Sequence, residues 1–182
     1  MRRAVRALAV AMSAMLLVVA MAGPAAAKKV SAEKYAKTLC TTLDNLVGSA
    51  EELVEAYNAL PVDDPATFQT QAVELVNGFL ADIQAAETKL KKLTPDVSGG
   101  KKIGKTFTEY LTGQATELKA AVDTFAAADP NGVAFAADVA QLEVAVNLLA
   151  TTAGDPFSTV TNQELLQAFD EEPACEDVVT VF

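Results

Sequence analysis

The sequence predicts an all-α protein: an antiparallel up-down four-helix bundle with a short fifth helix and a C-terminal tail pinned by a disulfide. Apolar residues recur every seven positions in four long segments, on the three-in-seven face that a helix turns toward a bundle core. Short connections rich in proline, glycine and aspartate separate these segments, so consecutive helices should alternate in direction. The chain also holds only two cysteines, Cys40 and Cys175, far apart in sequence.

The first predicted helix spans residues 31–60. Ser31 is a good N-cap, and Pro61 interrupts the apolar pattern directly after the segment. Because Cys40 falls on the apolar stripe, we expect its side chain in the core. The stripe has three columns: Ala36, Leu43, Ala50 and Tyr57; Leu39, Leu46, Leu53 and Leu60; and Cys40, Val47 and Val54.

The second predicted helix begins with Asp64 as N-cap and Pro65 in its first turn, which places negative charge at the positive end of the helix dipole. Gly78 lies inside this helix, at a cost of about 1 kcal/mol relative to alanine. We interpret this glycine as a point of close helix packing; a kink that serves a ligand is the alternative.

A polar connection, residues 94–100, leads into the third predicted helix, where Gln114 is the one polar residue at an expected core position. A buried amide needs partners, so we place Gln114 at the margin of the stripe or against a neighbouring helix, with a ligand contact as the alternative. The fourth helix should open after residues 129–132 and stop at Gly154.

A shorter fifth helix should start at a capping box formed by Thr161 and Glu164. The last residues, 178–182, are apolar and β-prone, and we expect them to pack against the bundle or to fray.

Residues 1–27 have the features of a cleaved signal peptide: early arginines, an apolar run over residues 7–21 and small residues up to Ala27. A membrane anchor is the alternative, but the run is shorter than the roughly 20 residues that span a bilayer. Residues 28–182 then form a single helical-bundle domain with no transmembrane segment. In an exported chain, two cysteines predict one disulfide, Cys40 to Cys175.

Composition argues against several functions. The chain has no histidine, which rules out catalysis that needs an imidazole, and with only two cysteines it also lacks the usual zinc sites. Its formal net charge is −10, and every arginine lies in the predicted signal peptide, so nucleic-acid binding is not expected. We therefore predict no enzyme, no cofactor and no metal site.

Alternating helices should gather almost all lysines at one end of the bundle. We hypothesise that this end contacts an anionic envelope component, such as a phosphate polymer or lipid headgroups. We favour a second interpretation, compatible with the first, in which the disulfide brings the acidic tail, residues 170–177, to the same end, where it neutralises the lysines. The candidate contact residues are Lys89, Lys91, Lys92, Lys101, Lys102 and Lys105.

The predicted function is a secreted or cell-envelope-associated, non-enzymatic binding module whose partner is a protein or an envelope polymer. The arginine-led signal and the alanine, valine, aspartate and threonine bias resemble those of exported proteins of high-GC bacteria, with no family motif. The alternative function is a carrier, in which small core residues leave a pocket for a lipid or another apolar ligand. These residues, which close helix packing also explains, are Ala50, Ala72, Ala86, Ala121 and Ala128.

Overall fold

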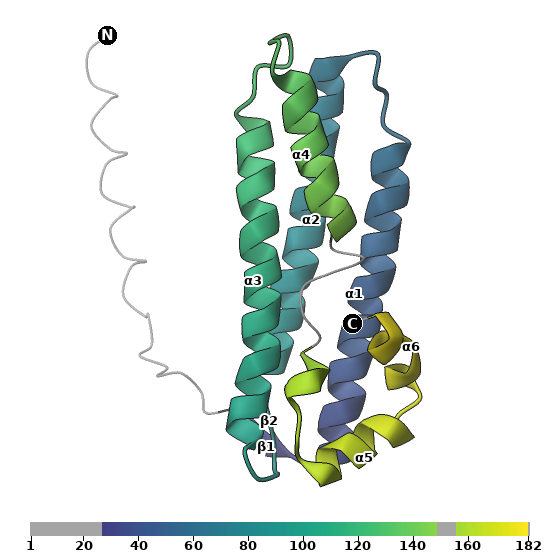
Figure 1. Ribbon diagram of the computed structural model, residues 1–182, viewed down its shortest axis with the longest axis vertical. Helices are drawn as coiled ribbons and strands as arrows, with labels where there is room; N and C mark the ends of the chain where they lie inside the picture. Colours follow the sequence, from purple (N-terminus) through teal and green to yellow (C-terminus); the bar gives the residue numbers. More distant parts are fainter. Residues whose placement is uncertain (1–26, 149–155, 182) are drawn as a thin grey trace, which may run out of the picture.

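The computed structural model describes residues 27–148 and 156–181, so nearly all of the predicted signal peptide lies outside the described residues (Figure 1). The described chain is mostly helical, which confirms the all-α fold class. Its helices are α1 (Ala32–Asn58), α2 (Pro65–Lys91), α3 (Gly100–Ala126), α4 (Phe135–Leu148), α5 (Gln163–Glu171) and α6 (Ala174–Val181), with a 3-10 turn η1 (Phe157–Thr159) and two strands, β1 (Lys28–Val30) and β2 (Leu93–Pro95).

The predicted N-cap residue is confirmed at two of the three helix starts for which one was predicted. Ser31 accepts a hydrogen bond from the Lys34 backbone N–H, and Asp64 accepts from two backbone N–H groups in the first turn of α2. The capping box predicted at Thr161 is wrong. Asn162 is the N-cap of α5, because its Oδ1 accepts from the Leu165 N–H at 3.0 Å and thus satisfies the first turn one residue later.

The predicted stripes form the core. On α1, Ala36, Leu39 and Cys40 are fully shielded from solvent. The apolar stripes of α2 and α3 also contain buried residues, such as Val76 of α2 and Leu118 of α3. Other stripe residues, such as Leu46 and Val54, are partly buried and pack against this core.

The predicted polar connection between the second and third helices is in part a strand. β2 pairs in parallel with β1, in the register Lys28 to Leu93 and Val30 to Pro95. The Lys28 N–H donates to the Lys92 carbonyl at 2.7 Å, so the start of α1 is held beside the end of α2. Sequence patterning missed this pair because a three-residue strand is too short to show alternation.

Aromatic rings join the helices at the opposite end. Tyr57 of α1 lies edge-on to Phe68 of α2, with ring centroids 5.7 Å apart, and Phe68 lies edge-on to Phe125 of α3 at 6.2 Å. Phe125 stacks on Phe135 of α4 at 5.5 Å. This aromatic cluster, formed by Tyr57, Phe68, Phe125 and Phe135, therefore connects α1 through α4.

The predicted disulfide between Cys40 and Cys175 is confirmed, with its two Sγ atoms 1.96 Å apart and both residues buried. It fastens α6 to α1, and α5 packs against the same helix (Figure 1). Of the two outcomes expected for the tail, packing against the bundle is confirmed, and the tail is helical through Val181 although its residues are β-prone. Its local β propensity is overridden because Val178 is buried in the core beside this crosslink.

The fourth predicted helix is described from Phe135 to Leu148, and its predicted end at Gly154 lies outside the described residues. α4 packs mainly against α3. Within residues 27–148 and 156–181, no helix combines the length and the apolar character needed to cross a bilayer.

Candidate functional site

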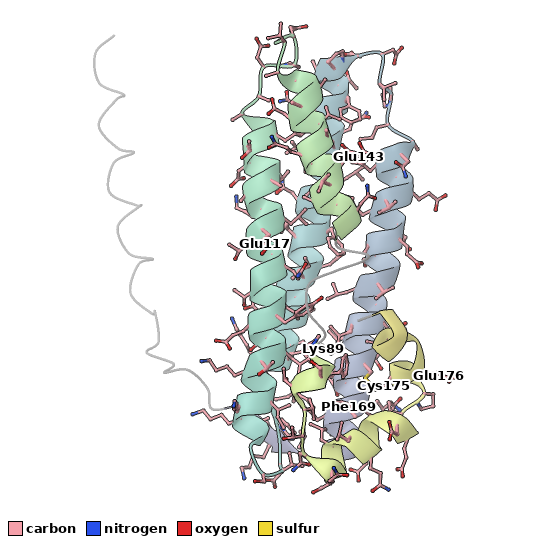
Figure 2. The ribbon with its side chains drawn as sticks, viewed as in Figure 1. Lys89, Glu117, Glu143, Phe169, Cys175 and Glu176 are labelled. Atoms are coloured by element: carbon pink, nitrogen blue, oxygen red, sulfur yellow. A yellow bond between two sulfur atoms is a disulfide. The ribbon has the colours of Figure 1, made fainter. Side chains whose placement is uncertain are left out.

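The structure brings the predicted contact lysines to one end of the molecule. The pairing of β1 with β2 sets Lys28 and Lys29 beside the last turn of α2 and the first turns of α3. Figure 2 places Lys89 in the same half of the molecule as Phe169 and Cys175. We call this region the lysine end; it comprises Lys28, Lys29, Lys34, Lys37, Lys89, Lys91, Lys92, Lys101, Lys102 and Lys105.

A hollow of about 590 Å³ opens at the lysine end, between β2 and the start of α3. Lysines line it from two sides, while Pro95, Gly99 and Gly100 contribute backbone and small surfaces. We call it the lysine hollow; its lysines are Lys29, Lys101, Lys102 and Lys105. Three of the six predicted contact residues thus share one concave surface, whereas Lys89, Lys91 and Lys92 lie outside its lining.

The local sequence explains the shape of the hollow. Gly99 has a φ of 75°, in the left-handed region that glycine tolerates best. A Cβ at Gly100 would lie 1.9 Å from the Pro95 carbonyl oxygen, so only glycine allows the chain to pass so close to β2. α3 therefore starts without a side-chain cap, and the positive end of its dipole adds to the lysine charges.

Some lysines of this end have acidic partners. Lys29 Nζ lies 2.7 Å from Asp96 Oδ1, and Lys91 Nζ lies 2.6 Å from Glu87 Oε1. The Lys91 ammonium, together with the Thr112 hydroxyl, holds the pKa of Glu87 below its usual value. Lys105 pairs with Glu109 at 3.2 Å. The lysine of each pair is exposed to solvent, so each ion pair contributes little to stability.

Among the described side chains, these partners do not come from the tail. Among described side chains, no ion pair joins a carboxylate of α5 or α6 to a lysine. Glu171 instead accepts from Gln167 Nε2 at 2.7 Å, one turn away on α5. The paired lysines, Lys29, Lys91 and Lys105, thus have partners in the turn after β2 or one turn away on the same helix. Lys89, Lys92, Lys101 and Lys102 have no acidic partner in the described part of the chain.

Lys29 is the one lysine of the hollow that sequence reasoning left out of the contact set. Its place depends on the pairing of β1 with β2, which joins residues far apart in the chain. The sequence places both Lys28 and Lys29 just before the first helix, and this position alone does not indicate which of the two lines the hollow.

The carrier alternative gains no support from the hollow found among the core columns. This hollow has a volume of about 40 Å³ and lies between α1, α2 and α3, with the half-buried Gln114 on its margin. Such a volume suits about one water molecule, whereas small-molecule pockets measure roughly 300–1,000 Å³. Ala50, Ala72 and Ala86 are buried, as close helix packing requires, whereas Ala121 and Ala128 are only half-buried.

No protein-family model matches this chain, and no curated protein or solved structure is similar to it. Within the described residues, no group of three or more acidic or cysteine side chains is arranged to hold a metal ion.

Proposed function

We propose that this protein is a non-enzymatic binding module, secreted or held at the cell envelope, whose lysine end contacts a phosphate-bearing envelope polymer or headgroup surface. The observation that carries the proposal is the lysine hollow, where Lys29 of β1 meets three lysines from the first turns of α3. Separate segments of the chain therefore converge on one concave, cationic surface.

Local charge decides this interaction, despite the formal net charge of −10. At physiological ionic strength, charges more than about 8 Å apart in solvent are largely screened. A bound phosphate therefore interacts mainly with the ammonium groups of the hollow. Lys101 and Lys102, which have no acidic partner among the described residues, are the lysines of the hollow most available to it. Ammonium groups on flexible stems suit phosphates that repeat along a polymer or over a surface.

We also infer an antiparallel four-helix bundle formed by α1 through α4. Two observations support it. The strand pair and the lysine hollow bring together the start of α1, the end of α2 and the start of α3. The aromatic cluster brings together the end of α1, the start of α2, the end of α3 and the start of α4. This arrangement explains why lysines from separate helices share one end. The disulfide is compatible with the oxidising conditions met by exported proteins.

The test is retention of residues 28–182 on anionic phospholipid vesicles and on immobilised polyphosphate. Replacing Lys101, Lys102 and Lys105 with Gln should abolish retention at moderate salt. The matched control replaces Lys34, Lys37 and Lys119, which removes the same charge outside the hollow, and should preserve most of it. Equal loss in both triple variants, or no loss in either, would contradict the proposal. Thermal unfolding verifies that each variant is folded.

A further inference from the structure

A second concave surface lies between α1 and α2, in the half of these helices that is remote from the strand pair. It is a groove of about 720 Å³, larger than the lysine hollow. Residues 49–58 of α1, the two residues that follow it and residues 71–82 of α2 line it, so each wall is about three turns, or roughly 17 Å, long. Its apolar floor is formed by Leu53, Ala56, Leu60, Leu75 and Phe79.

Gly78 lies in this groove and corrects the packing interpretation of that glycine. A Cβ built at Gly78 would have no neighbouring atom within 4 Å, so no helix approaches it closely. Glycine weakens a helix relative to alanine, and here neither a contact nor a positive φ requires it. Its effect is to leave open space midway along the groove, where Ala56 of α1 is also small.

Carboxylates lie beside this floor. On α2, Glu74 and Asp82 are one turn before and one turn after Gly78, and Glu52 is one turn before Ala56 on α1. All three carboxylates are exposed, and no ion pair or hydrogen bond to another described residue engages them. No lysine occurs in either wall. The groove thus combines an apolar floor with uncompensated negative charge.

We propose that the groove between α1 and α2 binds an amphipathic helix of a partner protein, with the helix's apolar stripe on the floor and its Lys or Arg residues beside Glu52, Glu74 and Asp82. Charge complementarity selects a cationic partner. The wall length suits about three helical turns, and Ala56 and Gly78 allow a third backbone to come close, as in other helix-in-groove interactions. This partner differs from the anionic ligand of the lysine end, so the two proposals stand or fall separately.

The test uses residues 28–182 and a synthetic amphipathic peptide of leucine and lysine, about 14 residues long, titrated by fluorescence anisotropy. Gly78→Leu fills the groove and should weaken binding about ten-fold or more. Gly113→Leu is the matched control, because a Cβ at Gly113 of α3 would also meet no atom within 4 Å but would lie outside the groove. It should leave the affinity within about two-fold of the original. Gly78→Ala keeps most of the open volume and verifies that the helix tolerates a side chain.

Charge variants separate the groove from general attraction to an acidic protein. Replacing Glu52 and Glu74 with Gln and Asp82 with Asn should weaken peptide binding about ten-fold, with a shallower salt dependence. The control changes Glu109, Glu117 and Asp123 of α3 in the same way; Figure 2 labels Glu117 on that helix. The groove variant should lose more affinity for the peptide than this control variant.

Four results would overturn the proposal: no peptide binding at high micromolar concentration, equal loss in both charge variants, equal binding of a peptide whose leucines are replaced by serine, or retained binding in a folded Gly78→Leu variant. Self-association that Gly78→Leu abolishes would also overturn it, because the occupant would then be a second copy of this chain. Polyphosphate retention by the Gly78→Leu variant should match the unmodified protein, which keeps this test distinct from that of the lysine end.

Discussion

At the end of the molecule where α1 begins, the chain is joined to itself by paired strands and, two to three turns along α1, by a disulfide. At the opposite end, aromatic rings of α1 through α4 make the connection. The first end also has packed rings, Phe107, Phe157 and Phe169, but it adds backbone hydrogen bonds and a covalent bond to them. At the second end, the rings connect the helices without a strand pair or a disulfide among the described residues. The two ends are therefore closed in physically different ways.

Of the variants that distinguish the two ends, those that remove the disulfide should lower the stability most. Cys40→Ser or Cys175→Ser should each lower the free energy of unfolding by about 5 kcal/mol, the loop-entropy value for a crosslink that spans 135 positions. The two losses should be similar because both variants remove the same bond. Urea unfolding measures them, and reduction of the unmodified protein should reproduce the loss. A variant with unchanged stability would show that the crosslink does not organise this end.

Hydrogen exchange on these variants shows whether the two ends are independent. Loss of the disulfide should accelerate amide exchange first in α5 and α6, which pack on α1 near Cys40. Amides around Phe68 and Phe125 should keep their protection until global unfolding. Simultaneous acceleration at both ends would mean that the molecule opens as one unit.

The next effect concerns the aromatic cluster. Phe125→Ala should cost about 3–4 kcal/mol, because Phe125 is 1% exposed and contacts both Phe68 and Phe135. The matched variant at the other end is Phe107→Ala, whose ring is 0% exposed and contacts Phe157 and Phe169. Both should lower the urea midpoint, but only Phe125→Ala should release the amides at the end of α3. The comparison fails if both release the same amides.

Two helical glycines should respond to alanine with opposite signs. Gly100→Ala places a Cβ 1.9 Å from the Pro95 carbonyl oxygen and should destabilise the strand-paired end by about 1–3 kcal/mol. Gly78→Ala meets no atom within 4 Å and should stabilise α2 by about 0.5–1 kcal/mol. Thermal unfolding of the two variants tests this. Equal shifts in the same direction would contradict the contrast.

The smallest effect compares a buried tyrosine from each end. The hydroxyls of Tyr35 and Tyr57 have no hydrogen-bond partner among the described residues. Since an unsatisfied buried hydroxyl is unfavourable, Tyr35→Phe and Tyr57→Phe should be neutral or stabilising by up to about 1 kcal/mol at pH 7. Chemical unfolding measures the change, and a clear loss of stability in either variant would indicate that its hydroxyl has a partner.

Tyr35 and Tyr57 should also make the stability of the protein depend on pH. Burial, with a smaller contribution from Glu143, raises the pKa of Tyr57 to about 12, and burial raises the pKa of Tyr35 as well. An unfolded tyrosine ionises near pH 10, so the unfolded state loses its proton first. The protein should hold its stability below about pH 10 and lose it as the pH rises toward 12. Tyr57→Phe should reduce this slope, as followed by unfolding and by tyrosinate absorbance.

Much of the helical architecture could be predicted because its signals are local. Seven-residue spacing located the core faces of α1, α2 and α3, and Ser31 and Asp64 marked two helix starts. The disulfide followed from there being a single possible cysteine pair. Lys101, Lys102 and Lys105 share the first turns of one helix, so their common surface was also predictable.

The remaining features depend on residues that are distant in sequence. The three-residue pairing of β1 with β2 brings Lys29 into the lysine hollow, and no periodic pattern announces it. Val178 lies in a helix although its neighbours favour strands, because burial beside the disulfide outweighs that local preference. Among the acidic partners of the lysines, Asp96 in the turn after β2 is distant in sequence from Lys29, whereas Glu87 and Glu109 lie one helical turn from Lys91 and Lys105 and could have been found from local spacing.

Sequence by itself determined the helical class, the core faces and the cysteine pair, because these depend on spacing along one helix or on composition. Tertiary structure decided which surfaces are concave. A glycine inside a helix has the same local signature whether a neighbouring helix covers it or leaves it open. Only the three-dimensional arrangement of α1 and α2 shows that Gly78 faces an open groove, and only the strand pair shows that Lys29 faces the lysine hollow.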